Sequence, residues 1–151
     1  MITIEEFKKK QTSKTRLIGL DLGSKRIGIS ICDEKQSIAT PFKTINRINT
    51  SELVNELKEI IIENNIKGIV IGNPINMDGT SGSSAQSVKD ISTNISQFID
   101  LPVFLWDERL STVGAFNLSS QLDVNISKKI KKIDENAAAF ILQGAIDYLN
   151  N

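Results

Sequence analysis

The chain has 151 residues, of which 40% are hydrophobic and 24% are charged. This length suits one domain with a buried core and leaves little room for a second domain. The 18 basic and 18 acidic residues cancel, so the chain lacks the basic excess that is typical of nucleic-acid-binding domains. No apolar run is long enough to span a bilayer, and the single cysteine, Cys32, has no partner for an internal disulfide. We expect a reduced, cytoplasmic protein.

The N-terminal segment MITIEEFKKK lacks the apolar stretch of a secretory signal. Thr3 and Glu6 have the spacing of a capping box, which predicts a short helix that ends near Lys10. Because this helix has little apolar periodicity, we treat residues 1–15 as an N-terminal extension. Residues 16–151 then form a single domain.

Two strands of a hairpin are predicted next. Residues 16–23 and 26–33 are two largely apolar runs separated by a short turn, which favours an antiparallel pair. A third strand is expected within residues 37–46, where Pro41 favours an edge position or a bulge.

The rest of the chain alternates between helices and strands. Residues 50–64 have helical apolar spacing, and residues 68–72 form a short apolar run that is typical of a buried parallel strand. The next helix has apolar residues at steps of three and four, at Val88, Ile91, Ile95 and Phe98. A buried strand at residues 102–106, a helix that begins near Ser111 and a last helix from Asp134 to Leu149 complete the order. The pattern predicts an α/β fold with a mixed five-stranded sheet, three antiparallel strands followed by two parallel ones, and helices on both faces.

One carboxylate interrupts the first apolar strand, in the segment RLIGLDLGSKRIGISICD. Alternation along the strand places Asp21 on one face with Leu17 and Gly19. An ionised carboxylate in an apolar setting requires a partner, and the chain contains no histidine. A basic residue, a backbone donor or a metal ion is therefore expected beside Asp21. An aspartate that caps a turn is the structural alternative.

Two further acids are candidates. Glu108 follows the strand at residues 102–106, at the end where open α/β sheets place their sites, although pairing with the next helix dipole explains it equally well. Asp134 opens the predicted last helix, where an N-cap role accounts for it without any chemistry. Together the three acids would repel one another without cations, and such a cluster suits two Mg²⁺ ions that activate water for phosphodiester cleavage.

Four segments, GLDLGSKRIGIS, GNPINMDGT, DERLST and KIDENAAAFIL, resemble the YqgF/RuvX family in order and approximate spacing. The resemblance covers residues 17–148. It implies an RNase H-like fold and a nuclease, described for the family as maturing the 5′ end of the 16S ribosomal RNA precursor or as a Holliday junction resolvase. It also implies that Asp21, Glu108 and Asp134 are catalytic acids that bind Mg²⁺ or Mn²⁺.

The resemblance further implies contacts with nucleic acid. The residues expected to make them are Lys25, Arg26, Asn76, Asp78, Gly79, Thr80, Arg109, Ser111, Thr112, Lys131 and Lys132. Two features depart from the family. Asn73 occupies a position that is commonly apolar, and SGSSAQS stands where relatives often carry basic residues.

Several functions stay open at this point. The leading one is a metal-dependent nuclease that processes the 16S precursor, free or within ribosomal particles, as a monomer or a homodimer. Cleavage of four-way DNA junctions would require a symmetric dimer. The segment GLDLGS also resembles the first phosphate loop of sugar kinases and Hsp70-like ATPases, but those proteins need two such domains. A non-catalytic RNA-binding assembly factor is the remaining alternative.

Overall fold

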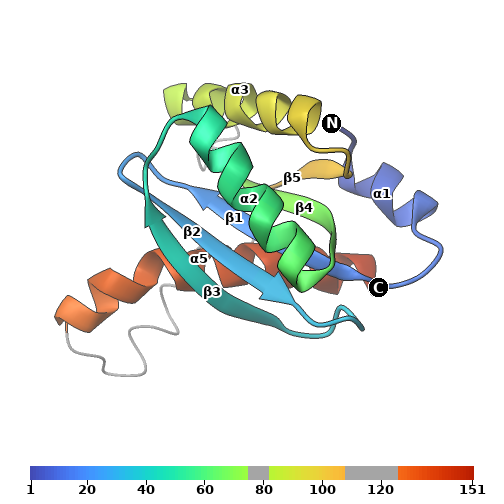
Figure 1. The fold of residues 1–151 in the computed structure, drawn as a ribbon. Coiled ribbons are helices and arrows are strands. Elements are labelled where there is room, and N and C mark those ends of the chain that lie inside the picture. Colours follow the sequence, from blue (N-terminus) through green and yellow to red (C-terminus); the bar gives the residue numbers. More distant parts are fainter. Residues whose placement is uncertain (75–81, 108–125) are drawn as a thin grey trace.

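Figure 1 shows the computed structural model, which describes residues 1–74, 82–107 and 126–151. For residues 83–84 and 126–135 it describes the helical backbone alone. The helices are α1 (Ile4–Lys10), α2 (Thr50–Asn64), α3 (Ser83–Phe98) and α5 (Ile126–Leu149), and the strands are β1 (Arg16–Leu22), β2 (Arg26–Cys32), β3 (Ala39–Asn46), β4 (Ile66–Asn73) and β5 (Val103–Asp107). No helix in the described ranges is long and apolar enough to cross a membrane.

The strands form one sheet in the order β3-β2-β1-β4-β5. β1 and β3 both pair antiparallel with β2, whereas β1, β4 and β5 run parallel to one another. The predicted mixed sheet is therefore confirmed. β3 is an edge strand, and its register shifts between Lys43, opposite Ile29, and Pro41, opposite Ser30. Phe42 is thus the extra residue of a bulge beside the proline, as the sequence predicted.

Helices cover both faces of the sheet, with α2 crossing in front of it and α5 behind it in Figure 1. Alternation along the strands divides the core between these two faces. Ile18, Leu20 and Leu22 belong to the cluster with α2 and α3, whereas Leu17 belongs to the cluster with α5. β1 is therefore buried on both sides, as a central strand of an α/β sheet must be.

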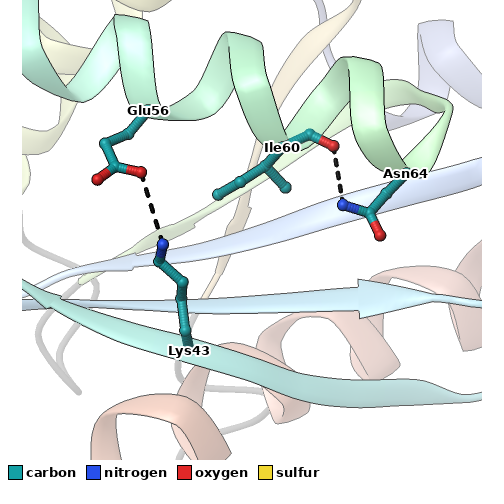
Figure 2. A network of polar contacts seen from close by, with 4 residues as sticks. All are labelled: Lys43, Glu56, Ile60 and Asn64. Atoms are coloured by element: carbon teal, nitrogen blue, oxygen red, sulfur yellow. Dashed lines mark hydrogen bonds and ion pairs between the residues drawn. The ribbon is translucent and has the colours of Figure 1, made fainter.

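Helix α2 is held on the sheet by its apolar residues more than by its charges. Figure 2 shows an ion pair between Lys43 of β3 and Glu56 of α2, with Nζ and Oε2 3.6 Å apart. Both side chains are about two-fifths exposed, so such a pair contributes at most about 1 kcal/mol. Burial of the Leu53 and Leu57 side chains stabilises the helix on the sheet by more than that. The helix ends where the Asn64 side-chain amide donates to the Ile60 carbonyl at 3.0 Å (Figure 2).

The inward face of α3 differs from the predicted one. Val88 and Ile95 are buried as expected, but Phe98 is 61% exposed. Ser92 and Ile99 are buried instead. The buried face therefore runs through Val88, Ser92, Ile95 and Ile99, at steps of four, three and four residues. Both faces have helical spacing, and the sequence favoured the one with Ile91 and Phe98 because it is the more apolar.

Helix α1 packs against the sheet instead of standing apart from it. Both hydrogen bonds of the Thr3–Glu6 capping box are present. Phe7 is 6% exposed, and its ring centroid lies 4.8 Å from that of Phe104 in β5. Ile2 donates its backbone N–H to the Val103 carbonyl at 3.0 Å, which ties the N-terminal segment to β5. The segment therefore completes the α5 side of the core.

Candidate functional site

Asp21 lies near the carboxyl end of β1 and is half-buried. Its neighbour across the hairpin is Gly28 of β2, which offers no side chain to fill the space beside the carboxylate. Because Leu17 faces α5, strand alternation places Asp21 on the same side of the sheet. The carboxylate thus stands between a rigid central strand and the helix that covers it.

The turn after Asp21 is braced by a basic residue that the sequence analysis missed. The Arg47 side chain donates to the Gly23 carbonyl at 2.6 Å, and its backbone N–H donates to the Lys25 carbonyl at 2.9 Å. Lys25 in this turn and Arg26 at the start of β2, two of the predicted nucleic-acid contacts, are both exposed. Three basic residues therefore gather at the end of β1 that carries Asp21. The one signal in the sequence for this role was that Arg47 directly follows the third predicted strand.

The carboxyl ends of β1, β4 and β5 meet at one edge of the sheet because these strands are parallel. Asn73 at the end of β4 lies opposite Asp107 at the end of β5, and both are half-buried. Phe104 and Trp106 belong to the cluster on the α5 side. The second acidic candidate, Glu108, follows Asp107 directly in the chain. Glu108 itself lies outside the described residues.

Helix α5 crosses the sheet antiparallel to β1. The Ser30 hydroxyl of β2 donates to the Ala138 carbonyl at 2.8 Å, at the level of Gly19. Further along the helix, the Gln143 side chain accepts the Ala39 N–H at 2.8 Å, beside the start of β1. From its first residue to its last, α5 therefore advances from the carboxyl end of β1 towards the amino end.

The predicted start of the last helix at Asp134 is wrong, because α5 begins at Ile126. Lysines, which favour helix, and regularly spaced isoleucines in residues 126–133 extend the helix by eight residues. Asp134 is consequently an interior helical residue and not an N-cap. It stands one turn before Ala138, about 6 Å along the axis, on the side towards the end of β1 that carries Asp21.

The side chains of the other predicted nucleic-acid contacts lie outside the described part of the chain. Lys131 and Lys132 belong to the helical backbone of α5, and their side chains are outside the described part. The residues that lie wholly outside the described ranges are Asn76, Asp78, Gly79, Thr80, Arg109, Ser111 and Thr112, and the helix predicted near Ser111 lies there too.

The donor set suits a hard divalent cation. Carboxylate oxygens are the ligands that Mg²⁺ and Mn²⁺ prefer, and Asp21 is a half-buried carboxylate at an open strand end. Among the side chains that the structure describes, no three of His, Cys, Asp and Glu stand together, and Glu108 and Asp134 are not in that set. The acidic trio stays a prediction, which the antiparallel course of α5 supports.

Comparison with known proteins agrees with the fold and the motifs. Residues 15–148 match the model of the RuvX family, described as Holliday junction resolvase. A protein of Pelagibacter ubique named "Putative pre-16S rRNA nuclease" is 76% identical over the whole of both chains. A protein of the same name from Cereibacter sphaeroides is 43% identical over 98% of this chain and 92% of its own.

Among solved structures, RuvC of Thermus thermophilus in complex with a Holliday junction superposes with a TM-score of 0.52 at 8% identity. The match covers 87% of this chain and 91% of that one. At this identity the likeness concerns the fold alone, which is the RNase H-like fold of RuvC. By the span of the family match and the identity to these relatives, the chain belongs to the RuvX family.

Proposed function

We propose that the chain is a metal-dependent nuclease that processes the 5′ end of the 16S ribosomal RNA precursor. The observation that carries the proposal is the position of Asp21, a half-buried carboxylate at the carboxyl end of a central strand, facing α5. The names of the full-length relatives support RNA as the substrate. Such a substrate would also place the protein in the cytoplasm, which stays a prediction.

In this proposal Asp21, Glu108 and Asp134 hold the metal. Mg²⁺ or Mn²⁺ bound there, in a two-metal arrangement, would activate water and stabilise the leaving oxygen of the phosphodiester. The chain has no histidine to act as a general base, which is consistent with activation of the water by the metal. β1 contributes rigidity, because β2 pairs with it at Asp21 and β4 pairs with it as far as Leu20.

The basic residues near the carboxyl end of β1 would position the RNA. Lys25 and Arg26 are exposed at the end of β1, and Arg47 braces the same turn. Lysine and arginine bind phosphates without reading sequence, so these residues would orient the backbone across Asp21. In a chain of zero net charge, this local cluster supplies positive surface where the proposal needs it.

The test is a cleavage assay on a 5′-extended 16S precursor with Mg²⁺ or Mn²⁺. Asp21→Asn keeps the shape of the side chain and removes its charge, so we expect cleavage to fall by more than about 100-fold, beyond what the loss of a supporting group costs a metal site. Asp100→Asn, the same change at an exposed position remote from β1, should cleave like the original protein. Equal cleavage by the Asp21 and Asp100 variants would contradict the proposal.

Cleavage of four-way DNA junctions is the second candidate, because the family model bears that description. A resolvase has to cut two strands related by a two-fold axis, so it should be a symmetric dimer. Metal-dependent cutting of the junction but not of the precursor, by a dimer, would favour this function. RNA binding without cleavage of either substrate, even in assembled ribosomal precursor particles, would favour a non-catalytic assembly factor.

A further inference from the structure

Ser30 is a buried hydroxyl on the face of β2 that α5 covers. It is 0% exposed, and its neighbours along the strand are Ile29 and Ile31. Cys32 belongs to the cluster on the α5 side, so strand alternation places Ser30 on that side too. A hydroxyl in such a setting costs free energy unless it is hydrogen-bonded, and an alanine would avoid that cost. The packing of the core therefore does not explain why a serine stands here.

The partner of this hydroxyl is the backbone of α5. Its Oγ atom lies 2.8 Å from the Ala138 carbonyl oxygen and 3.4 Å from that of Gly19. A hydroxyl has one proton, so it donates over the shorter distance, to Ala138. Gly19 stands directly opposite Ser30 in β1, and a Cβ atom there would clash with Ser30 Oγ and Leu142 Cβ. The hydrogen bond therefore joins helix and sheet where the two are in close contact.

From this hydrogen bond, two of the candidate acids are reached by steps of similar length. Asp21 follows Gly19 by two residues, which is about 7 Å along β1. Asp134 precedes Ala138 by four residues, which is about 6 Å along α5 and about one helical turn. Because α5 runs antiparallel to β1, both steps lead towards the same end of the sheet. A shift of α5 at Ala138 is therefore passed on to the spacing of the two acids.

We infer that Ser30 is a positioning residue, whose hydrogen bond to Ala138 sets the spacing between Asp21 and Asp134. This spacing in turn sets the affinity for Mg²⁺ or Mn²⁺, so the inference rests on the metal site of the proposed function. Mg²⁺ requires near-ideal octahedral ligands at about 2.1 Å, so a small displacement of a helix that carries a ligand lowers its affinity. Ser30→Ala removes the hydroxyl, but the Ala138 carbonyl keeps its bond within the helix. Helix α5 then stays folded and becomes free to shift.

The first experiment measures Mn²⁺ binding without RNA, from the electron paramagnetic resonance signal of the free ion. We expect Ser30→Ala to weaken Mn²⁺ binding about tenfold, the lower end of what the loss of a supporting group costs a metal site. Asp21→Asn should abolish the tight binding, which identifies the site that is titrated. Unchanged affinity in Ser30→Ala would overturn the inference. Tight binding that survives Asp21→Asn, or that the original protein lacks, would overturn it as well.

A control variant separates positioning from a general loosening of α5. Gln143 attaches the helix to the sheet further from the candidate site, because its side chain accepts the Ala39 N–H at 2.8 Å. Gln143→Ala loosens the helix about 14 Å along its axis from Asp134, so Mn²⁺ affinity should stay unaltered. Equal losses of affinity in Gln143→Ala and Ser30→Ala would show that Ser30 only stabilises the fold.

Ser92→Ala is the matched control for the substitution itself. Ser92 is also 0% exposed, but it belongs to α3 on the other face of the sheet, and its Oγ has no hydrogen-bond partner among the described residues. This variant should bind Mn²⁺ like the original protein. Thermal unfolding verifies that all variants fold. If Ser30→Ala did not fold, Ser30→Cys would carry the same test, because a thiol fills the site but donates only weakly.

The last experiment separates the role of Ser30 from the nuclease. Cleavage of the 5′-extended 16S precursor is measured against the Mn²⁺ concentration. Ser30→Ala should need about tenfold more Mn²⁺ for the half-maximal rate, with an unchanged KM for the RNA. The same Mn²⁺ requirement in both proteins would sink the role of Ser30 and leave the nuclease standing. Weaker Mn²⁺ binding by Ser30→Ala, with no cleavage of the precursor by the original protein, would do the reverse.

Discussion

Cys32 ends β2 with 2% of its surface exposed, and its Sγ accepts the Leu17 backbone N–H at 3.2 Å. Burial raises the pKa of this thiol to about 11 from an ordinary value of 9.0, because the thiolate loses its hydration in the core. The neutral thiol therefore belongs to the folded state at neutral pH. The contribution of this thiol to the free energy of unfolding should be constant below about pH 9 and should fall as the pH rises from there to about 11.

We predict that Cys32 reacts slowly with Ellman's reagent in the native protein. At pH 8 a thiol of pKa about 11 has roughly a hundredfold less thiolate than one of pKa 9.0, and burial blocks access as well. Labelling should therefore be more than about 100-fold slower than in urea-unfolded protein at the same pH. Native labelling at the unfolded rate would show that the thiol is not buried in solution.

At the scale of elements, the close approach of α5 to β1 depends on Gly19. A Cβ atom there would lie 2.5 Å from Ser30 Oγ, 2.7 Å from Leu142 Cβ and 3.1 Å from the Ala138 carbonyl oxygen. The first two distances are too short for any real contact, so the helix or the strand would have to move. Since α5 also carries Asp134, the same glycine sets how that residue stands relative to Asp21.

We predict that Gly19→Ala lowers the free energy of unfolding by about 1–3 kcal/mol, the usual effect of overpacking a core. It should also reduce cleavage of the 16S precursor, because α5 is displaced from the sheet. Urea unfolding followed by circular dichroism measures the first effect. A Gly19→Ala protein as stable and as active as the original would show that α5 does not pack this closely.

Gly68→Ala is the matched control for this prediction. A Cβ atom at Gly68 would meet Leu17 Cδ2 at 2.8 Å, which is the end of a flexible side chain that can rotate away. The loss of stability should therefore be under about 1 kcal/mol, and α5 should keep its place. Losses of equal size in the two variants would mean that adding a methyl group to any core strand has the same effect.

The sequence predicted the strands better than the helices, for a physical reason. Strand alternation has a period of two, so the faces of Leu17 and Asp21 followed directly from the pattern. In a helix, two neighbouring faces can both have apolar residues at steps of three and four. Whether Phe98 or Ile99 is buried depends on where α3 meets the sheet. The start of α5 was missed because Asp134 is a good N-cap residue but does not have to be one.

The position of Asp21 was predictable because this residue lies near the end of a strand. The parallel order of β1, β4 and β5 brings their carboxyl ends to one edge, and the alternating elements indicated such a sheet. The bracing role of Arg47 was not predictable, since it depends on a tertiary hydrogen bond to Gly23. A pocket lined by Ile2, Trp106 and Tyr148 was not predictable either, since it depends on where the N-terminal segment packs.

At the scale of the whole molecule, the two faces of the sheet have separate cores. The α2 and α3 side gathers mainly isoleucines and leucines, whereas the α5 side includes Phe7 and Ile4 of α1. Helix α1 is also tied to the C-terminus, because Lys8 donates to the Tyr148 carbonyl at 3.3 Å and to that of Asn151. The N-terminal segment should therefore contribute to the stability of the whole domain.

We predict that Phe7→Ala lowers the free energy of unfolding by about 3 kcal/mol or more, because it empties a buried aromatic site against Phe104. Phe98→Ala removes the same side chain from a position that is 61% exposed, so its effect should stay within about 0.5 kcal/mol. Urea unfolding of both variants measures the difference. A single transition with a lower midpoint for Phe7→Ala would make α1 part of one cooperative unit, whereas equal midpoints would make it a dispensable extension.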